Sequence, residues 1–148
     1  MGVRILVVDD FAKWRHHATA ALRQEPDLQI VAEAADGITA VEKAKELQPD
    51  LILLDIGLPD LNGMEVARQI RDCCPQSKIL IVSEQHLSEI AEEAFHAGAY
   101  GYVVKSHAGR ELLAAVKTVL QGKRFVSVSL KERMRSALPH LTLVDSPE

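Results

Sequence analysis

The chain carries five short apolar segments, each of strand length and rich in Val, Ile and Leu. They lie at Arg4–Val8, Leu28–Ala34, Leu51–Leu54, Lys78–Val82 and Gly101–Val104. Their apolar character is mostly continuous rather than alternating, which is typical of strands that helices cover on both faces. This feature predicts a buried parallel sheet.

Segments with helical periodicity separate these strands. The clearest has apolar residues on one face, at Leu112, Leu113, Val116, Val119 and Leu120. Five strands alternating with five helices form a (βα)5 pattern, and right-handed crossovers then favour an open, doubly wound sheet. We therefore predict an α/β fold with a doubly wound parallel five-stranded sheet, of the flavodoxin-like type.

Charge and composition narrow the class of protein. The 148 residues include 17 basic and 21 acidic ones, for a formal net charge of -4, which gives no reason to expect direct nucleic-acid binding by this chain. The chain has two cysteines, Cys73 and Cys74, and adjacent cysteines rarely have the geometry for a disulfide with each other. A chain without a disulfide is typical of a reducing compartment. No apolar run approaches a membrane-spanning length. We expect a cytoplasmic protein without a membrane contact.

Polar residues follow four of the predicted strands. Ligands of doubly wound sheets bind at the carboxyl ends of the strands, where the strand order reverses. Three carboxylates in one crevice repel one another unless a cation is bound, and their hard oxygens suit Mg²⁺. With the metal and an ammonium group neutralising a phosphoryl group, a carboxylate can attack phosphorus. The residues placed there are Asp9, Asp10, Asp55, Ser83 and Lys105.

Each of these residues also has an ordinary structural interpretation. Asp9 or Asp10 alone would cap a helix, Ser83 alone would be a turn residue, and Lys105 alone would be a solvated strand end. Their joint placement favours a site. Asp50 and Asp60 lie beside prolines in loops and are expected to face solvent, so they are left out of the site.

Four motifs carry a resemblance to a known family. They are "ILVVDD", "DLILLDIGLPDLNGMEVARQIR", "ILIVSE" and "GYVVKS", and together they resemble the receiver domain of bacterial two-component response regulators over about residues 3 to 122. The resemblance implies that a histidine kinase or a phosphotransfer protein is the phosphodonor. It also implies that the chain is not an enzyme, beyond its own phosphorylation and dephosphorylation.

The resemblance assigns roles position by position. Asp55 is the phosphoacceptor, Asp10 and Asp55 bind Mg²⁺ directly, and Asp9 binds it through water. The Gly57 carbonyl is the backbone ligand. The residues that contact the phosphoryl group are Ser83 and Lys105.

The resemblance also implies how the signal leaves the site. Ser83 moves toward the phosphoryl group, and Tyr102 matches the aromatic position that turns inward in response. The loop after Asp55 is expected to fold over the metal with the help of Gly57 and Gly63. A homodimer or a downstream effector protein is the expected partner of the changed surface.

The C-terminal segment resembles a subgroup of this family. "GKRFVSVSL", from Gly122, is similar to the segment after receivers that are joined to a LuxR/NarL-type helix-turn-helix domain. We expect a receiver at 1–122 and an extension or linker at 123–148, too short for a complete output domain. "LKERMRSALPHL" is expected to form a helical piece and "TLVDSPE" a tail or linker.

Two positions depart from the family pattern. Glu84 stands where a small residue is usual, and its charge is expected to change the rates of phosphorylation and hydrolysis. Ser106 stands where many receivers have proline, and the site is expected to tolerate it.

Four functions stay open from the sequence. The first is a phosphorylation-controlled switch, and the second is the input half of a DNA-binding regulator. The third is an aspartyl-phosphate phosphohydrolase, disfavoured because such enzymes need a carboxylate where this chain has Gly57. The fourth is a scaffold that has lost phosphorylation, disfavoured because all five site side chains are present.

Overall fold

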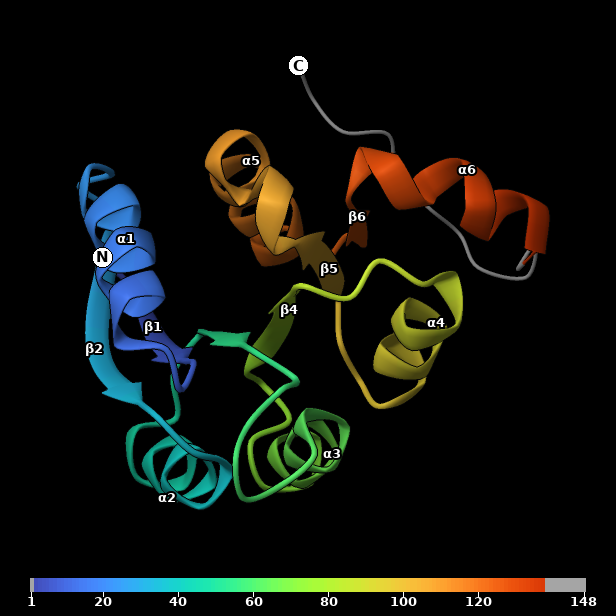
Figure 1. Ribbon diagram of the computed structural model, residues 1–148. Coiled ribbons are helices and arrows are strands. Elements are labelled where there is room, and N and C mark those ends of the chain that lie inside the picture. The colour runs from blue at the N-terminus through green and yellow to red at the C-terminus, as the bar shows by residue number, and fades with distance from the viewer. Residues whose placement is uncertain (1, 138–148) are drawn as a thin grey trace.

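A computed structural model of the chain describes residues 2–137. The strands form one parallel sheet in the order β2-β1-β3-β4-β5-β6 (Figure 1). Their bounds are β1 Val3–Val8, β2 Leu28–Ala34, β3 Leu51–Leu54, β4 Lys78–Ser83, β5 Gly101–Val104 and β6 Phe125–Val126. The five segments expected to be strands are confirmed, with bounds that differ by no more than one residue.

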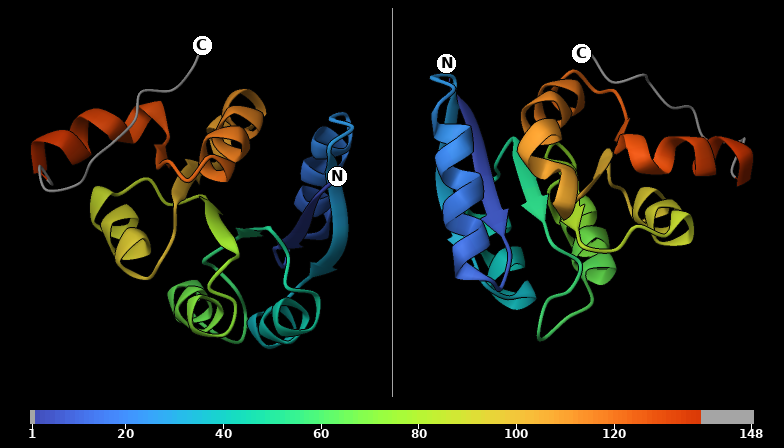
Figure 2. Two further views of the ribbon diagram at one scale, coloured as in Figure 1. Left: turned by 180° about the vertical axis from the view of Figure 1, so that it is seen from behind. Right: turned by 45° about the horizontal axis from the view of Figure 1, so that its top comes forward.

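Helices cover both faces of this sheet (Figures 1 and 2). Their bounds are α1 Ala12–Arg23, α2 Gly37–Leu47, α3 Gly63–Cys73, α4 Ser88–His96, the 3-10 turn η1 Lys105–His107, α5 Ala108–Leu120 and α6 Val128–Ala137. Within β1, Ile5 and Val7 pack in the core under α1 and α5, whereas Leu6 and Val8 pack in the core under α2, α3 and α4. The continuous apolar pattern of the strands reflects this burial on two sides. The doubly wound α/β fold is thus confirmed.

The sheet has one strand more than the sequence predicted. β6 pairs in parallel with β5 at the sheet edge, with Phe125 opposite Gly101 and Val126 opposite Tyr102. Phe125 and Val126 are fully buried. A strand of two residues is too short to show a period, so only its position beside β5 identifies it.

The C-terminal extension packs on the domain in its described part. α6 begins at Val128, two residues before the expected helical segment, and buries Leu130 and Met134 in the core beside α4. The expected tail "TLVDSPE" lies outside the described residues. Among residues 2–137, no helix is long and apolar enough to cross a membrane.

Candidate functional site

The acidic residues lie at the point where the strand order reverses. β1 has β2 on one side and β3 on the other, so the crevice opens beyond the ends of β1 and β3. Val8 is in register with Leu54, and the Asp55 amide donates to the Val8 carbonyl at 3.0 Å. This register places Asp9 and Asp55 side by side.

Three carboxylates meet in this crevice. Oxygens of Asp9, Asp10 and Asp55 lie within 4.8 Å of one another. Asp9 is fully buried, Asp55 is 7% exposed and Asp10 is exposed. An all-oxygen donor set of this charge fits a hard divalent cation, with Asp10 as the group most open to solvent. Neither Asp9 nor Asp10 is the N-cap of α1, which is Phe11; Asp9 instead accepts a hydrogen bond from the Phe11 amide at 2.9 Å.

The crevice works against ionisation of Asp55. Burial raises the pKa of Asp55 above its usual value, and the neighbouring Asp9 carboxylate raises it further. A hydrogen bond from the Gly57 amide, 3.2 Å from Asp55 Oδ1, and the charge of Lys105 lower the same pKa and offset part of this effect. A bound cation would act in the same direction as Lys105, so the site is suited to one.

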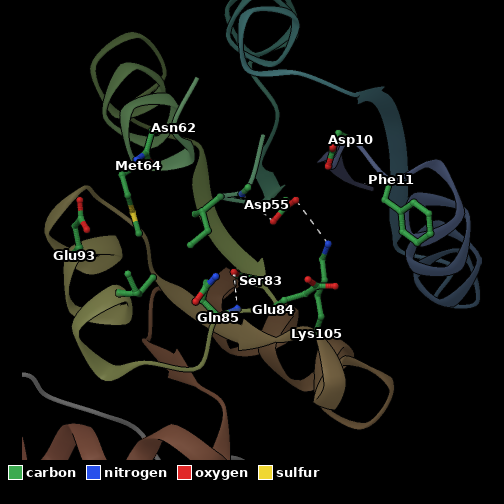
Figure 3. Close-up of a pocket in the computed structure, with 13 residues that line it drawn as sticks. Asp10, Phe11, Asp55, Asn62, Met64, Ser83, Glu84, Gln85, Glu93 and Lys105 are labelled. Atoms are coloured by element: carbon green, nitrogen blue, oxygen red, sulfur yellow. Dashed lines mark hydrogen bonds and ion pairs between the residues drawn. The ribbon is translucent and has the colours of Figure 1, made fainter. Parts of the chain in front are cut away.

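Lys105 begins the turn after β5 and reaches into the same crevice. Its Nζ lies 2.6 Å from Asp9 Oδ2 and 3.7 Å from Asp55 Oδ2. Figure 3 shows the side chain directed at Asp55. Nζ also lies 5.0 Å from the centre of the Trp14 ring, so the indole is close enough to respond to charge in the site.

Ser83 and Tyr102 are linked through one loop residue. Ser83 Oγ accepts a hydrogen bond from the Gln85 amide at 3.1 Å, and the Tyr102 hydroxyl donates to the Gln85 carbonyl at 2.8 Å. Tyr102 is fully buried, so in this structure its ring has the inward position. Burial raises the pKa of Tyr102; the Ser83 hydroxyl lowers it and the Asp55 charge raises it.

The loop after Asp55 is shaped by Gly63 more than by Gly57. A Cβ on Gly63 would lie 2.2 Å from the Ile56 Cα, whereas a Cβ on Gly57 would meet only Asp55 oxygens at 3.8 Å. Neither glycine has a positive φ. The requirement at Gly63 is therefore a close approach of two backbone segments, and nothing comparable constrains Gly57.

Asp60 has a structural contact that the sequence did not predict. It is exposed, as expected, but its carboxylate accepts hydrogen bonds from the Gly37 and Ile38 amides at 2.7 and 3.0 Å. These bonds lower the pKa of Asp60 below its usual value. Asp60 thus ties the loop that follows Asp55 to the first turn of α2, outside the crevice.

The crevice has a volume of about 550 Å³. Of the expected site residues, the fully buried Asp9 and Tyr102 do not line it. Its lining also includes residues from loops and helices that the sequence did not point to. They are Phe11, Ile56, Asn62, Met64, Gln85, Ile90 and Glu93 (Figure 3). Asn62 caps α3, since its side-chain oxygen accepts from the Met64 amide at 2.8 Å.

Replacing Lys105 with glutamine should destabilise the protein in metal-free buffer. The change removes the cation paired with the fully buried Asp9. Leaving a buried acceptor without its partner costs about 1–3 kcal/mol, and more when the acceptor is charged. Added Mg²⁺ should recover part of this loss by supplying charge to the same carboxylates. Urea unfolding with and without Mg²⁺ measures both effects.

Lys78→Gln is the matched control for Lys105→Gln. Lys78 begins β4, at the amino end of the strand, and its Nζ lies 4.6 Å from the centre of the Tyr100 ring rather than beside a carboxylate. Equal losses in the two variants, with no recovery by Mg²⁺, would contradict a charge-balancing role for Lys105.

The fold and this site define the class of protein. It is a doubly wound domain whose acidic crevice, suited to a cation, also holds a lysine and lies where the strand order reverses. The family model described as the response regulator receiver domain matches residues 5–117. The chain belongs to this family of two-component signalling proteins. Receiver domains of the family typically use Mg²⁺ and are generally not true enzymes.

Individual relatives agree with this assignment. The chain is 30% identical over 146 residues to the transcriptional regulatory protein DegU of Brevibacillus brevis, covering 99% of this chain and 62% of the relative. It is 33% identical over 129 residues to the oxygen regulatory protein NreC of Staphylococcus aureus, covering 86% and 59%. The chain thus spans about three fifths of the length of these curated relatives.

A solved structure has the same fold over most of the chain. The crystal structure of a LuxR-family two-component response regulator from an Aurantimonas species superposes with a TM-score of 0.88 at 34% identity, covering 93% of this chain and 98% of that one. The receiver domain of the response regulator NarL from Mycobacterium tuberculosis gives a TM-score of 0.78 at 31% identity, covering 82% and 98%. The resemblance to the LuxR/NarL-type subgroup is confirmed.

Proposed function

We propose that Asp55 accepts a phosphoryl group from a histidine kinase or a phosphotransfer protein, with Mg²⁺ bound, and that the modified domain switches a protein-interaction surface. The observation that carries the proposal is the meeting of three carboxylates and Lys105 at the switch point of a receiver fold. No external substrate is turned over.

The carboxylates of the crevice fit Mg²⁺, and each site residue would have its own part in binding it. Asp10 and Asp55 would hold Mg²⁺ directly, Asp9 through water, and Gly57 through its carbonyl. Bound Mg²⁺ supplies positive charge that offsets the charge on the phosphoryl oxygens. The roles of Asp9 and Asp10 are thus to hold the metal beside Asp55.

Phosphoryl transfer itself needs little movement of the protein. Asp55 is fixed by β3 and by the Gly57 amide, so its free carboxylate oxygen is presented to the crevice. That oxygen forms a bond to phosphorus as the bond from phosphorus to the donor's imidazole nitrogen breaks, and the electron pair stays on the nitrogen. Lys105 stabilises the negative charge of the phosphoryl oxygens.

The switch uses Ser83 and Tyr102. A phosphoryl group on Asp55 offers strong acceptor oxygens to the Ser83 hydroxyl, which now accepts from the Gln85 amide. Movement of Ser83 toward the phosphoryl group would leave space beside β5, and Tyr102 would fill it in the inward position that it has in this structure. Phosphorylation would therefore bias an equilibrium between two arrangements of the loop after β4.

The output of the switch is proposed from the relatives. Response regulators interact with kinases, and form dimers or bind DNA through output domains. Because DegU is named a transcriptional regulatory protein, we propose residues 1–122 as a cytoplasmic receiver and 123–148 as its extension, which together act as the input part of such a regulator. A second copy or a downstream effector would be the partner. A phosphohydrolase stays disfavoured, since Gly57 offers no acid two residues after Asp55.

The proposal predicts that acetyl phosphate with Mg²⁺ adds one phosphoryl group to the intact chain. Excess chelator should prevent the addition, because without the metal Lys105 alone cannot offset three carboxylates that repel the donor. Intact-mass measurement detects the adduct, and borohydride reduction followed by peptide mass spectrometry would locate it, since an acyl phosphate is reduced to homoserine. A modified residue other than Asp55, or no adduct on a folded chain, would refute the proposal.

A further inference from the structure

Glu84 stands at the boundary between two cavities. It follows Ser83 and lines the crevice that holds Asp55 and Lys105 (Figure 3). It also lines a second cavity of about 300 Å³, between the loop after β4 and α6. Among the described residues, no other side chain lines both of these cavities. The exposed Glu84 carboxylate can therefore be accommodated on either side.

The second cavity is rich in groups that attract a carboxylate. Its other lining residues are His86, Val104, Ser106, His107, Ser129 and Arg133. The Arg133 guanidinium makes one long hydrogen bond, to the His86 carbonyl at 3.5 Å. Within residues 2–137, no ion pair is formed by either Glu84 or Arg133. A cation and an anion thus border one cavity without being paired.

Arg133 is carried by a firmly anchored helix. Leu130 and Met134 of α6 are fully buried against α4 and the sheet. Just before the helix, the Ser127 hydroxyl donates to Glu111 Oε1 at 2.5 Å and accepts from the Val104 amide at 2.8 Å. The position of Arg133 is therefore set by the core, so a contact with it would connect the loop after β4 to α6.

We propose that the Glu84 side chain moves when Asp55 is phosphorylated: its carboxylate leaves the crevice and pairs with Arg133 on α6. The proposal rests on the proposed function of Asp55. Aspartyl phosphate carries about 1.5 to 2 negative charges where the Asp55 carboxylate carried one, and this added charge repels the Glu84 carboxylate. Arg133 lines the second cavity together with Glu84, so the cavity offers Glu84 a cation. A glutamate at position 84, where the family usually has a small residue, would then have a function, because a small side chain could not pair with Arg133.

The test measures amide hydrogen exchange of residues 128–134 in the full chain, with Mg²⁺ and with or without beryllofluoride as the phosphoryl mimic. The adduct should slow exchange of this segment by about two- to fivefold, the range that one exposed ion pair supports. Glu84→Gln and Arg133→Gln should each abolish the slowing of exchange. The double variant should show no greater loss of slowing than either single variant. Glu46→Gln and Arg23→Gln, on exposed sites of α2 and α1, are the matched controls and should retain it.

Fluorine NMR of the same samples separates the two proposals. Bound beryllofluoride without a Glu84-dependent slowing at residues 128–134 would overturn the role of Glu84 and leave phosphorylation of Asp55 intact. Absence of any bound beryllofluoride on the folded chain would overturn both. Slowing that persists in Glu84→Gln would equally refute the pairing with Arg133.

Discussion

Asp55→Asn is expected to lose all adduct formation with acetyl phosphate and with beryllofluoride. An amide has nearly the shape of a carboxylate but has no anionic oxygen to attack phosphorus. The crevice should keep its form, because Asp55 is fixed by β3 and by the hydrogen bond from the Gly57 amide to Oδ1. Intact mass and fluorine NMR report the loss, and far-ultraviolet circular dichroism reports that the fold is retained.

The same variant should be more stable than the parent protein in metal-free buffer at neutral pH. Burial and the Asp9 carboxylate raise the pKa of Asp55 in the folded state. A group with a raised folded-state pKa contributes stability fully below its unfolded-state pKa, and this contribution is lost as pH rises through the folded-state value. At neutral pH ionised Asp55 is therefore unfavourable, and the amide removes that cost.

Two comparisons test the stability effect of Asp55→Asn. The gain over the parent should shrink as pH falls below the folded-state pKa of Asp55, and also when Mg²⁺ is added to neutralise the cluster. Asp27→Asn, at an exposed position before β2, should show neither trend. A gain that does not depend on pH would mean that repulsion among the carboxylates is not its cause.

Gly63→Ala should destabilise the fold by about 2–4 kcal/mol, as a strong overpacking change does. The new Cβ would lie 2.2 Å from the Ile56 Cα and 2.9 Å from the Asp55 carbonyl oxygen, and neither is the end of a flexible side chain. The loop would have to move away from α3, and Asp55 is the residue before Ile56. We therefore also expect a lower affinity for Mg²⁺, measured by Trp14 fluorescence alongside urea unfolding.

Gly109→Ala is the control for Gly63→Ala. Gly109 lies in α5, and a Cβ there would meet nothing within 4 Å. Alanine in a helix is favoured over glycine by about 0.5–1 kcal/mol, so this variant should be slightly more stable than the parent. Similar effects at the two positions would show that the close approach of Gly63 to Ile56 is relaxed in solution.

Much of the site could be predicted because it depends on strand ends. Asp9, Asp10 and Asp55 follow β1 and β3, whose apolar residues identify them as buried strands, and parallel strands end at one edge of a sheet. Ser83 ends β4 and Lys105 follows β5, so the same rule places them. These are local patterns combined with one topological rule, and they need no knowledge of which loops touch.

The remaining features arise from contacts between segments far apart in the chain. β6 is a strand only because Phe125 and Val126 lie beside β5, and Asp60 holds the start of α2 only because its loop lies there. The place of Glu84 between two cavities depends on α6 packing against α4. Local composition carries no signal for such contacts, since side chains separated by many residues meet only after the core has fixed the distances between helices, strands and loops.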